Sequence, residues 1–125
     1  MRILVRRTTS VMDEAKSVLI ANYTEKDLQD AVLMKDIHGW LLIHYACVRN
    51  VPLEVIQMLL DSDTGKKTIL EKTRWGLQLP IHYACSSNAP VEVIQLLLDS
   101  DTEKKTILKK DHCGRLPIHL ACLNN

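Results

Sequence analysis

A five-residue pattern that occurs three times constrains the fold of this chain more than any other feature of its sequence. Ile-His-Tyr-Ala-Cys stands at residues 43–47 and again at 81–85, and Ile-His-Leu-Ala-Cys stands at 118–122. The three histidines follow one another at intervals of 38 and 37 residues. The segments between them match as well, because residues 54–64 and 92–102 differ at a single position. Repeats of this length predict a solenoid, in which each unit packs only against its neighbours.

Each unit is predicted to fold into two helices. The first runs from about Pro80 to Ser86, since a proline fits the first helical turn and the apolar side chains at 81, 84 and 85 share one face. A break at 86–89 precedes a second helix, which starts at Pro90 and ends near residues 99–101. The second helix is apolar almost all round, which implies burial between neighbours. Such a helix pair cannot bury its own apolar surface, so the units must stack.

Two segments, 36–46 and 111–121, resemble the ankyrin repeat. In that family an Asp and a Gly in a turn precede Thr-Pro-Leu-His-x-Ala, and the second helix ends in a run of Leu. The resemblance covers about residues 30–125. It implies an all-α solenoid of stacked helix-turn-helix repeats joined by turn connectors. It further implies a non-catalytic scaffold that binds another protein and needs no cofactor.

The chain departs from the family pattern in two ways. The Thr before the proline is replaced by Leu41, Leu79 and Leu116, so the hydroxyl that commonly bonds the histidine is absent. The repeats also exceed the usual length of about 33 residues. The excess falls in loops, where insertions cost little free energy, so the stacking is expected to survive.

The repeats divide the chain, which is expected to be one domain of residues 1–125. Residues 36–72 and 73–110 are expected to be complete repeats, 1–35 a degenerate N-terminal half repeat, and 111–125 a truncated repeat without its second helix. Repeat arrays typically need about three units and polar caps. We therefore expect the chain to be a fragment of a longer array, or to self-associate through an uncapped C-terminal end.

Two further packing features are expected. Asp13 to Tyr23 resembles a degenerate second helix of a preceding unit. Three short segments recur at equivalent positions in the connectors and are expected to form an apolar ladder from repeat to repeat: 31–33, 68–70 and 106–108.

The composition favours an intracellular protein, cytoplasmic or nuclear, with free thiols. The net charge of +1 gives no overall attraction to nucleic acid or to an anionic membrane. Four cysteines without a signal peptide do not indicate a secreted disulfide scaffold. Asp13 and Glu14 come too early for a targeting presequence, and no apolar run approaches the roughly 18 residues that cross a bilayer.

The His-x-x-Cys pairs are the one arrangement that suggests metal or catalytic chemistry. Two ligands three residues apart share a helix face and could hold zinc. Packing is the preferred interpretation, because free Cys behaves as a small apolar residue and the family uses the His to bond backbone between repeats. A catalytic site is normally one asymmetric arrangement, whereas these pairs recur: His44/Cys47, His82/Cys85 and His119/Cys122. Cys113, beside His112 in a turn, is the thiol expected to be exposed and reactive.

The residues that differ between repeats are the candidates for partner contact. The framework is nearly identical across units, while the turns and the ends of the first helices diverge. In ankyrin-like stacks these positions line the face that contacts partners, and Trp and Arg are enriched at interface hot spots. The alternative for either Trp is that it covers a neighbouring repeat. The candidates are Ile37, His38, Trp40, Arg49, Arg74, Trp75, Gln78, Ser87, His112, Cys113 and Arg115.

Two other functions remain open. One is a nucleic-acid or phosphate-binding module that uses the connector lysines as a stripe, although nearby aspartates favour an ordinary solvated face. The other is a structural spacer within a longer array. The lysines concerned are Lys66, Lys67, Lys104, Lys105, Lys109 and Lys110.

Overall fold

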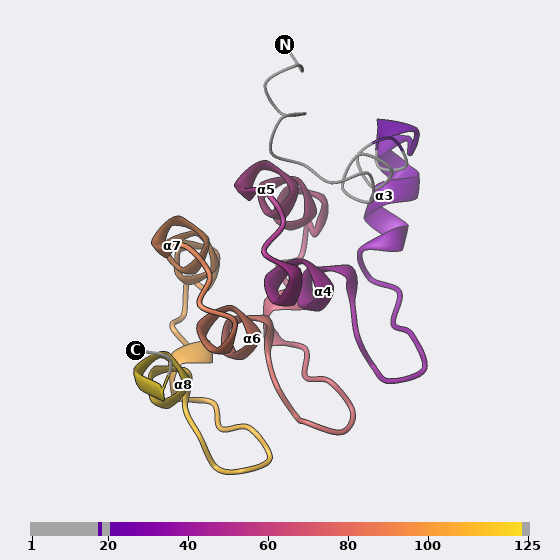
Figure 1. Cartoon of the computed structure of the whole chain (residues 1–125). Helices are drawn as coiled ribbons and strands as arrows, with labels where there is room; N and C mark the ends of the chain where they lie inside the picture. The colour runs from indigo at the N-terminus through magenta and orange to yellow at the C-terminus, as the bar shows by residue number, and fades with distance from the viewer. Residues whose placement is uncertain (1–17, 19–20, 124–125) are drawn as a thin grey trace.

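The computed structural model describes residues 18 and 21–123, and this part of the chain contains helices and no strand (Figure 1). The predicted all-α architecture is confirmed. Residues 24–123 contain six α-helices separated by loops, and two 3-10 turns, η1 and η2, lie in the long connectors. In chain order the elements are α3 (Glu25–Ala31), α4 (Leu42–Arg49), α5 (Leu53–Ser62), η1 (Thr68–Leu70), α6 (Pro80–Ser86), α7 (Val91–Ser100), η2 (Thr106–Leu108) and α8 (Pro117–Leu123).

The helices stack in two rows (Figure 1). α4, α6 and α8 contact one another in succession and form the inner row, while α5 and α7 contact each other and form the outer row. α5 packs on α4 and α7 packs on α6, so both predicted helix pairs are present. Three long loops project in the same direction from the inner row (Figure 1). We call them finger 1 (32–41), finger 2 (71–79) and finger 3 (109–116).

The helix boundaries follow the sequence signals closely. α6 begins at Pro80 and ends at Ser86, as predicted. α7 begins one residue after Pro90 and ends at Ser100. A proline accounts for both starts, because its fixed φ suits the first turn and its missing N–H has no partner there in any case.

α3 is a helix that the repeat pattern does not predict. Thr24 caps its N-terminus through a reciprocal pair of bonds, in which the Thr24 Oγ1 accepts the Asp27 N–H at 3.1 Å and the Asp27 carboxylate accepts the Thr24 N–H at 3.5 Å. Leu28 is buried, and α3 packs against α5. α3 therefore covers the side of the first repeat that faces the N-terminus. Of the helix predicted over Asp13 to Tyr23, residues 13–17, 19 and 20 lie outside the described residues.

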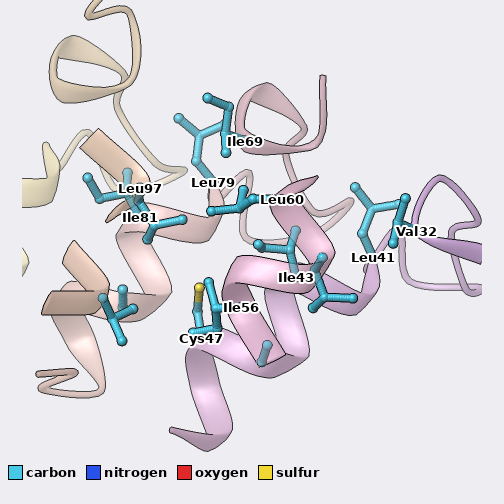
Figure 2. Packing of buried hydrophobic residues seen from close by; sticks show 14 of the residues in the cluster. Val32, Leu41, Ile43, Cys47, Ile56, Leu60, Ile69, Leu79, Ile81 and Leu97 are labelled. Atoms are coloured by element: carbon cyan, nitrogen blue, oxygen red, sulfur yellow. The ribbon is translucent and has the colours of Figure 1, made fainter. Parts of the chain in front are cut away.

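One continuous apolar cluster runs through both rows (Figure 2). Leu41 and Leu79, which replace the threonine of the family pattern, are each only 1% exposed. Ile56 of α5 and Leu97 of α7 are buried in the same cluster. The two leucines therefore occupy core volume at the start of α4 and α6, where the family pattern has a hydroxyl.

The outer helix α7 is less buried than its apolar sequence predicts. Val93 and Leu97 are buried, but Ile94, Leu96 and Leu98 are only half-buried. The side of α7 that faces α5 and α6 is covered, and these two are the helices of residues 21–123 that pack closely on it. The prediction of burial all round therefore holds for one face of the helix.

The expected apolar ladder forms only in part, because the connectors are held by hydrogen bonds as well. Ile69 is buried, but its counterpart Ile107 is 40% exposed. The buried carboxylate of Asp63, which follows α5, accepts both the backbone N–H and the hydroxyl of Thr68 in η1, each at 2.7 Å. The Asp101 carboxylate, which follows α7, accepts the same two groups of Thr106 in η2 at 2.7 and 2.6 Å. Both connectors share this pair of bonds, which we call the Asp–Thr clamp.

Replacing Thr68 by Val should therefore destabilise the protein although the two side chains have nearly the same shape. The change removes a hydroxyl that bonds a buried carboxylate, and a hydrogen bond to a charged group contributes about 1.5–3 kcal/mol. We expect the free energy of unfolding in urea to fall by about that amount.

Thr64→Val is the matched control, because Thr64 lies exposed in the same connector. It should change the free energy of unfolding by less than about 0.5 kcal/mol. Equal effects of the two substitutions would show that the clamp does not hold the connector.

Candidate functional site

Each finger turns around a side chain near its start. In finger 1 an Asp36 carboxylate oxygen accepts the backbone N–H groups of His38 and Trp40, both at 2.9 Å. In finger 3 an Asp111 carboxylate oxygen accepts those of Cys113 and Arg115, again both at 2.9 Å. The same local bonding therefore shapes both turns.

Finger 2 is built differently, because a threonine stands where the other fingers have an aspartate. The Thr73 hydroxyl accepts the Gln78 N–H at 3.3 Å, and the Thr73 N–H donates to the Gln78 carbonyl at 3.0 Å. The turn includes Leu77, whose φ is 51°. The tip of this finger, including Trp75, is therefore presented differently from the other two.

Neighbouring fingers are tied to each other through their backbones. The Arg74 N–H donates to the His38 carbonyl at 3.0 Å, and the His112 N–H donates to the Gly76 carbonyl at 3.0 Å. A Cβ on Gly39 would stand 3.0 Å from the Arg74 nitrogen, and the φ of Gly39 is 76°. Glycine is thus required here both for the turn and for the close approach of finger 2. The three tips form one connected surface.

Trp40 serves the packing between repeats. Its ring lies 4.6 Å from the Tyr83 ring of α6 and 4.8 Å from the Tyr45 ring of α4, measured between centroids. The Tyr45 hydroxyl in turn donates to Asp36, and this bond and the N–H bonds from Trp40 and His38 lower the pKa of Asp36. The sequence makes Trp40 a candidate either for partner contact or for packing over a neighbouring repeat. Its contact with Tyr83 of the next repeat corresponds to the second of these.

Trp75 lies in the opposite situation, since its side chain is 72% exposed at the tip of finger 2. Ile37 at the tip of finger 1 is 75% exposed. Arg74 of finger 2 and His38 of finger 1 are exposed beside them in the sequence, and Arg49 is exposed at the end of α4. These five residues present their side chains to solvent.

Of the remaining candidates, three make hydrogen bonds within the protein and two are exposed. Gln78 donates to the Asp111 carboxylate at 3.1 Å, and the Ser87 hydroxyl donates to the Cys47 carbonyl at 2.8 Å. Arg115 donates through Nε to Asp111 at 3.1 Å. These three side chains join neighbouring repeats or shape a finger. His112 and Cys113 are exposed.

The charge of the fingers is opposite to that of the outer row. The three fingers carry six Lys and Arg side chains against three Asp and Glu, whereas α5 and α7 carry four acidic side chains and no basic one. The acidic groups of the fingers are also engaged. Glu71 pairs with Lys35 at 2.8 Å. Burial opposes ionisation of Asp111, but the N–H bonds it accepts and the nearby Arg115 charge hold its pKa well below the usual range. The fingers thus present a basic surface.

Buried histidines connect the inner helices to the fingers that follow them. His44 Nδ1 accepts the Leu41 N–H at 2.9 Å, and His44 Nε2 lies 2.9 Å from the Glu71 carbonyl oxygen. His82 makes the same two contacts, with the Leu79 N–H at 2.9 Å and the Lys109 carbonyl at 3.0 Å. Since a carbonyl only accepts, Nε2 carries the proton and each ring is neutral. Burial lowers the pKa of His44 to about 4 and also lowers that of His82.

The first two His-x-x-Cys pairs are therefore structural. Both nitrogens of His44 and His82 are bonded to backbone, which leaves no lone pair for a metal ion. Burial raises the pKa of the Cys47 thiol to about 12 and raises that of Cys85. In the third pair, His119 Nδ1 accepts the Leu116 N–H at 2.8 Å.

Two lysines of the connector stripe cap the outer helices. Lys66 Nζ donates to the Leu60 carbonyl at 3.0 Å, and Lys104 Nζ donates to the Leu98 carbonyl at 3.2 Å. Cations at a helix C-terminus also interact favourably with the helix dipole. These bonds account for a lysine at the same position of both connectors without any ligand.

The sequence comparisons agree with this architecture. The family profile described as ankyrin repeats, three copies, matches residues 43–125. The chain therefore belongs to the ankyrin-repeat family, whose members generally act as protein-interaction modules. A comparison with curated proteins finds no match. Within residues 18 and 21–123, no helix is both long enough and apolar enough to cross a membrane.

The neutral buried histidine makes stability depend on pH. A group whose pKa is lower in the folded state binds more protons when the chain is unfolded, so stability is lost as the pH falls below the unfolded value of about 6.5. With a folded pKa of about 4, His44 alone should lower the free energy of unfolding by about 2 kcal/mol between pH 7 and pH 5. Urea titrations at the two pH values measure this difference.

His44→Gln should give a protein that is less stable at pH 7 but whose stability changes less with pH. The control is His38→Gln, which replaces an exposed histidine and should leave the pH dependence as it is in the wild type. Part of the pH dependence should remain in His44→Gln, because burial also lowers the pKa of His82. A pH dependence equal to that of the wild type would show that His44 does not contribute.

Proposed function

We propose that this chain is a non-catalytic scaffold that binds an acidic segment of another protein through its fingers. The exposure of Trp75 and Ile37 at the tips of adjacent, mutually bonded fingers carries this proposal. Membership of a family of protein-interaction modules supports it.

Two large apolar side chains held at 72% and 75% exposure gain free energy when a partner covers them. Because the Arg74 N–H and the His38 carbonyl fix the two tips relative to each other, little ordering entropy is lost on binding. Arg74 stands next to Trp75, and Trp and Arg are the residue types that most often dominate interface energetics. The centre of the proposed interface is therefore finger 2.

The basic charge of the fingers determines what kind of segment would bind. Lys72 and Arg74 belong to finger 2, and Lys109 and Lys110 to finger 3, whereas the outer helices carry only acidic charges. Since complementary potentials speed association and exclude wrong partners, the fitting partner carries Asp or Glu beside aromatic or aliphatic anchors. The acidic outer row would repel the same segment.

The nucleic-acid alternative depends on the connector lysines. The roles of Lys66 and Lys104 as helix caps weaken it, because the repetition of these residues then has a structural reason. A spacer without a partner remains the other alternative. Binding measurements separate all three functions.

Peptides selected from a random display library against the full chain should be rich in acidic residues and contain an aromatic or large aliphatic anchor. Trp75→Ala should weaken binding of such a peptide by about 30-fold, the equivalent of the roughly 2 kcal/mol that a hot-spot residue contributes. Isothermal titration calorimetry measures the change. Circular dichroism should show an unchanged helical spectrum, because Trp75 is exposed.

Gln57→Ala and Gln95→Ala are the matched controls, since these exposed side chains lie on the outer helices. Both variants should bind the selected peptide as the wild type does. Selection of no peptide would favour the spacer. Tight binding of a single-stranded oligonucleotide that weakens by about 10³-fold between 50 and 200 mM salt would favour the phosphate-binding alternative.

A further inference from the structure

His112 and Cys113 form an exposed pair at the tip of finger 3. Neither the packing of the repeats nor the proposed partner surface depends on the contact between them. The Cys113 Sγ lies 3.3 Å from the His112 Nε2. The corresponding positions in finger 1 are Ile37 and His38, and in finger 2 Arg74 and Trp75, so the pair occurs in one finger only. Unlike the His-x-x-Cys pairs, it is not a framework feature of the repeat.

The neighbouring finger determines the tautomer of the His112 imidazole. His112 Nδ1 lies 3.1 Å from the Gly76 carbonyl oxygen, and the His112 backbone N–H donates to the same oxygen at 3.0 Å. Because a carbonyl oxygen can only accept, Nδ1 is the nitrogen that carries the proton. In the neutral ring Nε2 then has a free lone pair, and this lone pair faces the thiol of Cys113. A nucleophile, a base and a third group that orients the base are thus in contact.

We propose that Cys113 is a reactive thiol that forms a mixed disulfide with a small anionic disulfide, of which oxidised glutathione is the test case. His112 Nε2 accepts the thiol proton, and the Cys113 sulfur attacks one sulfur of the disulfide. The new S–S bond forms as the old one breaks, and the departing thiolate takes up the proton. Cys113 is oxidised, one half of the disulfide leaves as a reduced thiol, and no further oxidant is required.

The charges of finger 3 favour an anionic reagent. Lys109, Lys110 and Arg115 belong to this finger, and the carboxylate of its one acidic residue, Asp111, is buried. These charges attract the carboxylates of glutathione.

A metal ion fits the same residues poorly. The ligand atoms of Asp111, His112 and Cys113 lie within 4.8 Å of one another. The Asp111 oxygens, however, already accept the N–H groups of Cys113 and Arg115, the Gln78 amide and the Arg115 guanidinium. Only two ligand atoms are left, beside a guanidinium cation. Two ligands fall short of the three or four that hold zinc in proteins.

The test treats the full chain with an excess of oxidised glutathione near neutral pH and follows adducts on each cysteine by peptide mass spectrometry. Cys122 is the internal reference, because it is also exposed. We expect Cys113 to react about tenfold faster than Cys122, because the His112 nitrogen that lies 3.3 Å from its sulfur takes up the thiol proton. The buried Cys47 and Cys85 should stay unmodified, which verifies the fold in the same sample.

His112→Gln should reduce the rate at Cys113 to that at Cys122, while Cys47 and Cys85 stay protected. Cys122→Ser should leave the rate at Cys113 unchanged. The proposal is overturned if Cys113 reacts no faster than Cys122, or if His112→Gln leaves its rate as it was. Protection of Cys113 by one equivalent of Zn²⁺ would also overturn it and assign the pair to metal binding. None of these outcomes depends on a protein partner, so the proposed scaffold function is tested separately.

Discussion

The stack depends on buried histidines whose two ring nitrogens are both hydrogen-bonded to backbone. In the first repeat the ring joins the N–H that precedes α4 to a carbonyl of finger 2, 27 residues later in the chain. In the second repeat it joins the start of α6 to finger 3 in the same way. Leu41 and Leu79, whose N–H groups donate to these rings, are buried, as are the two histidines. An apolar surround strengthens a satisfied hydrogen bond and penalises an unsatisfied one, so the position of each finger is strongly determined.

Fingers that are fixed at the base can support exposed side chains at the tip. The backbone bonds between fingers, from Arg74 to His38 and from His112 to Gly76, connect the tips into one surface. This constraint allows Trp75 to remain exposed in a defined place, and it allows His112 to be oriented by a residue of another finger. The bonds that hold the fingers to the inner helices and to one another thus also fix the positions of Trp75 and His112, on which the two proposals depend.

The repeat pattern predicts the helix pairs well, because proline and apolar spacing act locally. It predicts the candidate site less well, because the roles of its residues depend on distant contacts. Trp40 and Trp75 are both turn residues in the sequence, yet Trp40 meets Tyr83 of the next repeat while Trp75 stands in the differently built turn of finger 2. The Asp–Thr clamp is missed because an apolar segment suggests apolar packing alone. The capping box at Thr24 is a sequence signal for the start of α3, but it lies outside the repeat pattern.

The acceptor of each histidine bond is a main-chain carbonyl, and this has an evolutionary consequence. The carbonyl belongs to Glu71 in one repeat and to Lys109 in the next, so the bond is the same while the side-chain charge is reversed. Any residue can supply that oxygen, so the histidine bond does not constrain the side chain at this position. Mutations of Glu71 or Lys109 can thus change the charge of the surface without breaking the histidine bond. Duplicated repeats can therefore diverge in specificity while their architecture stays intact.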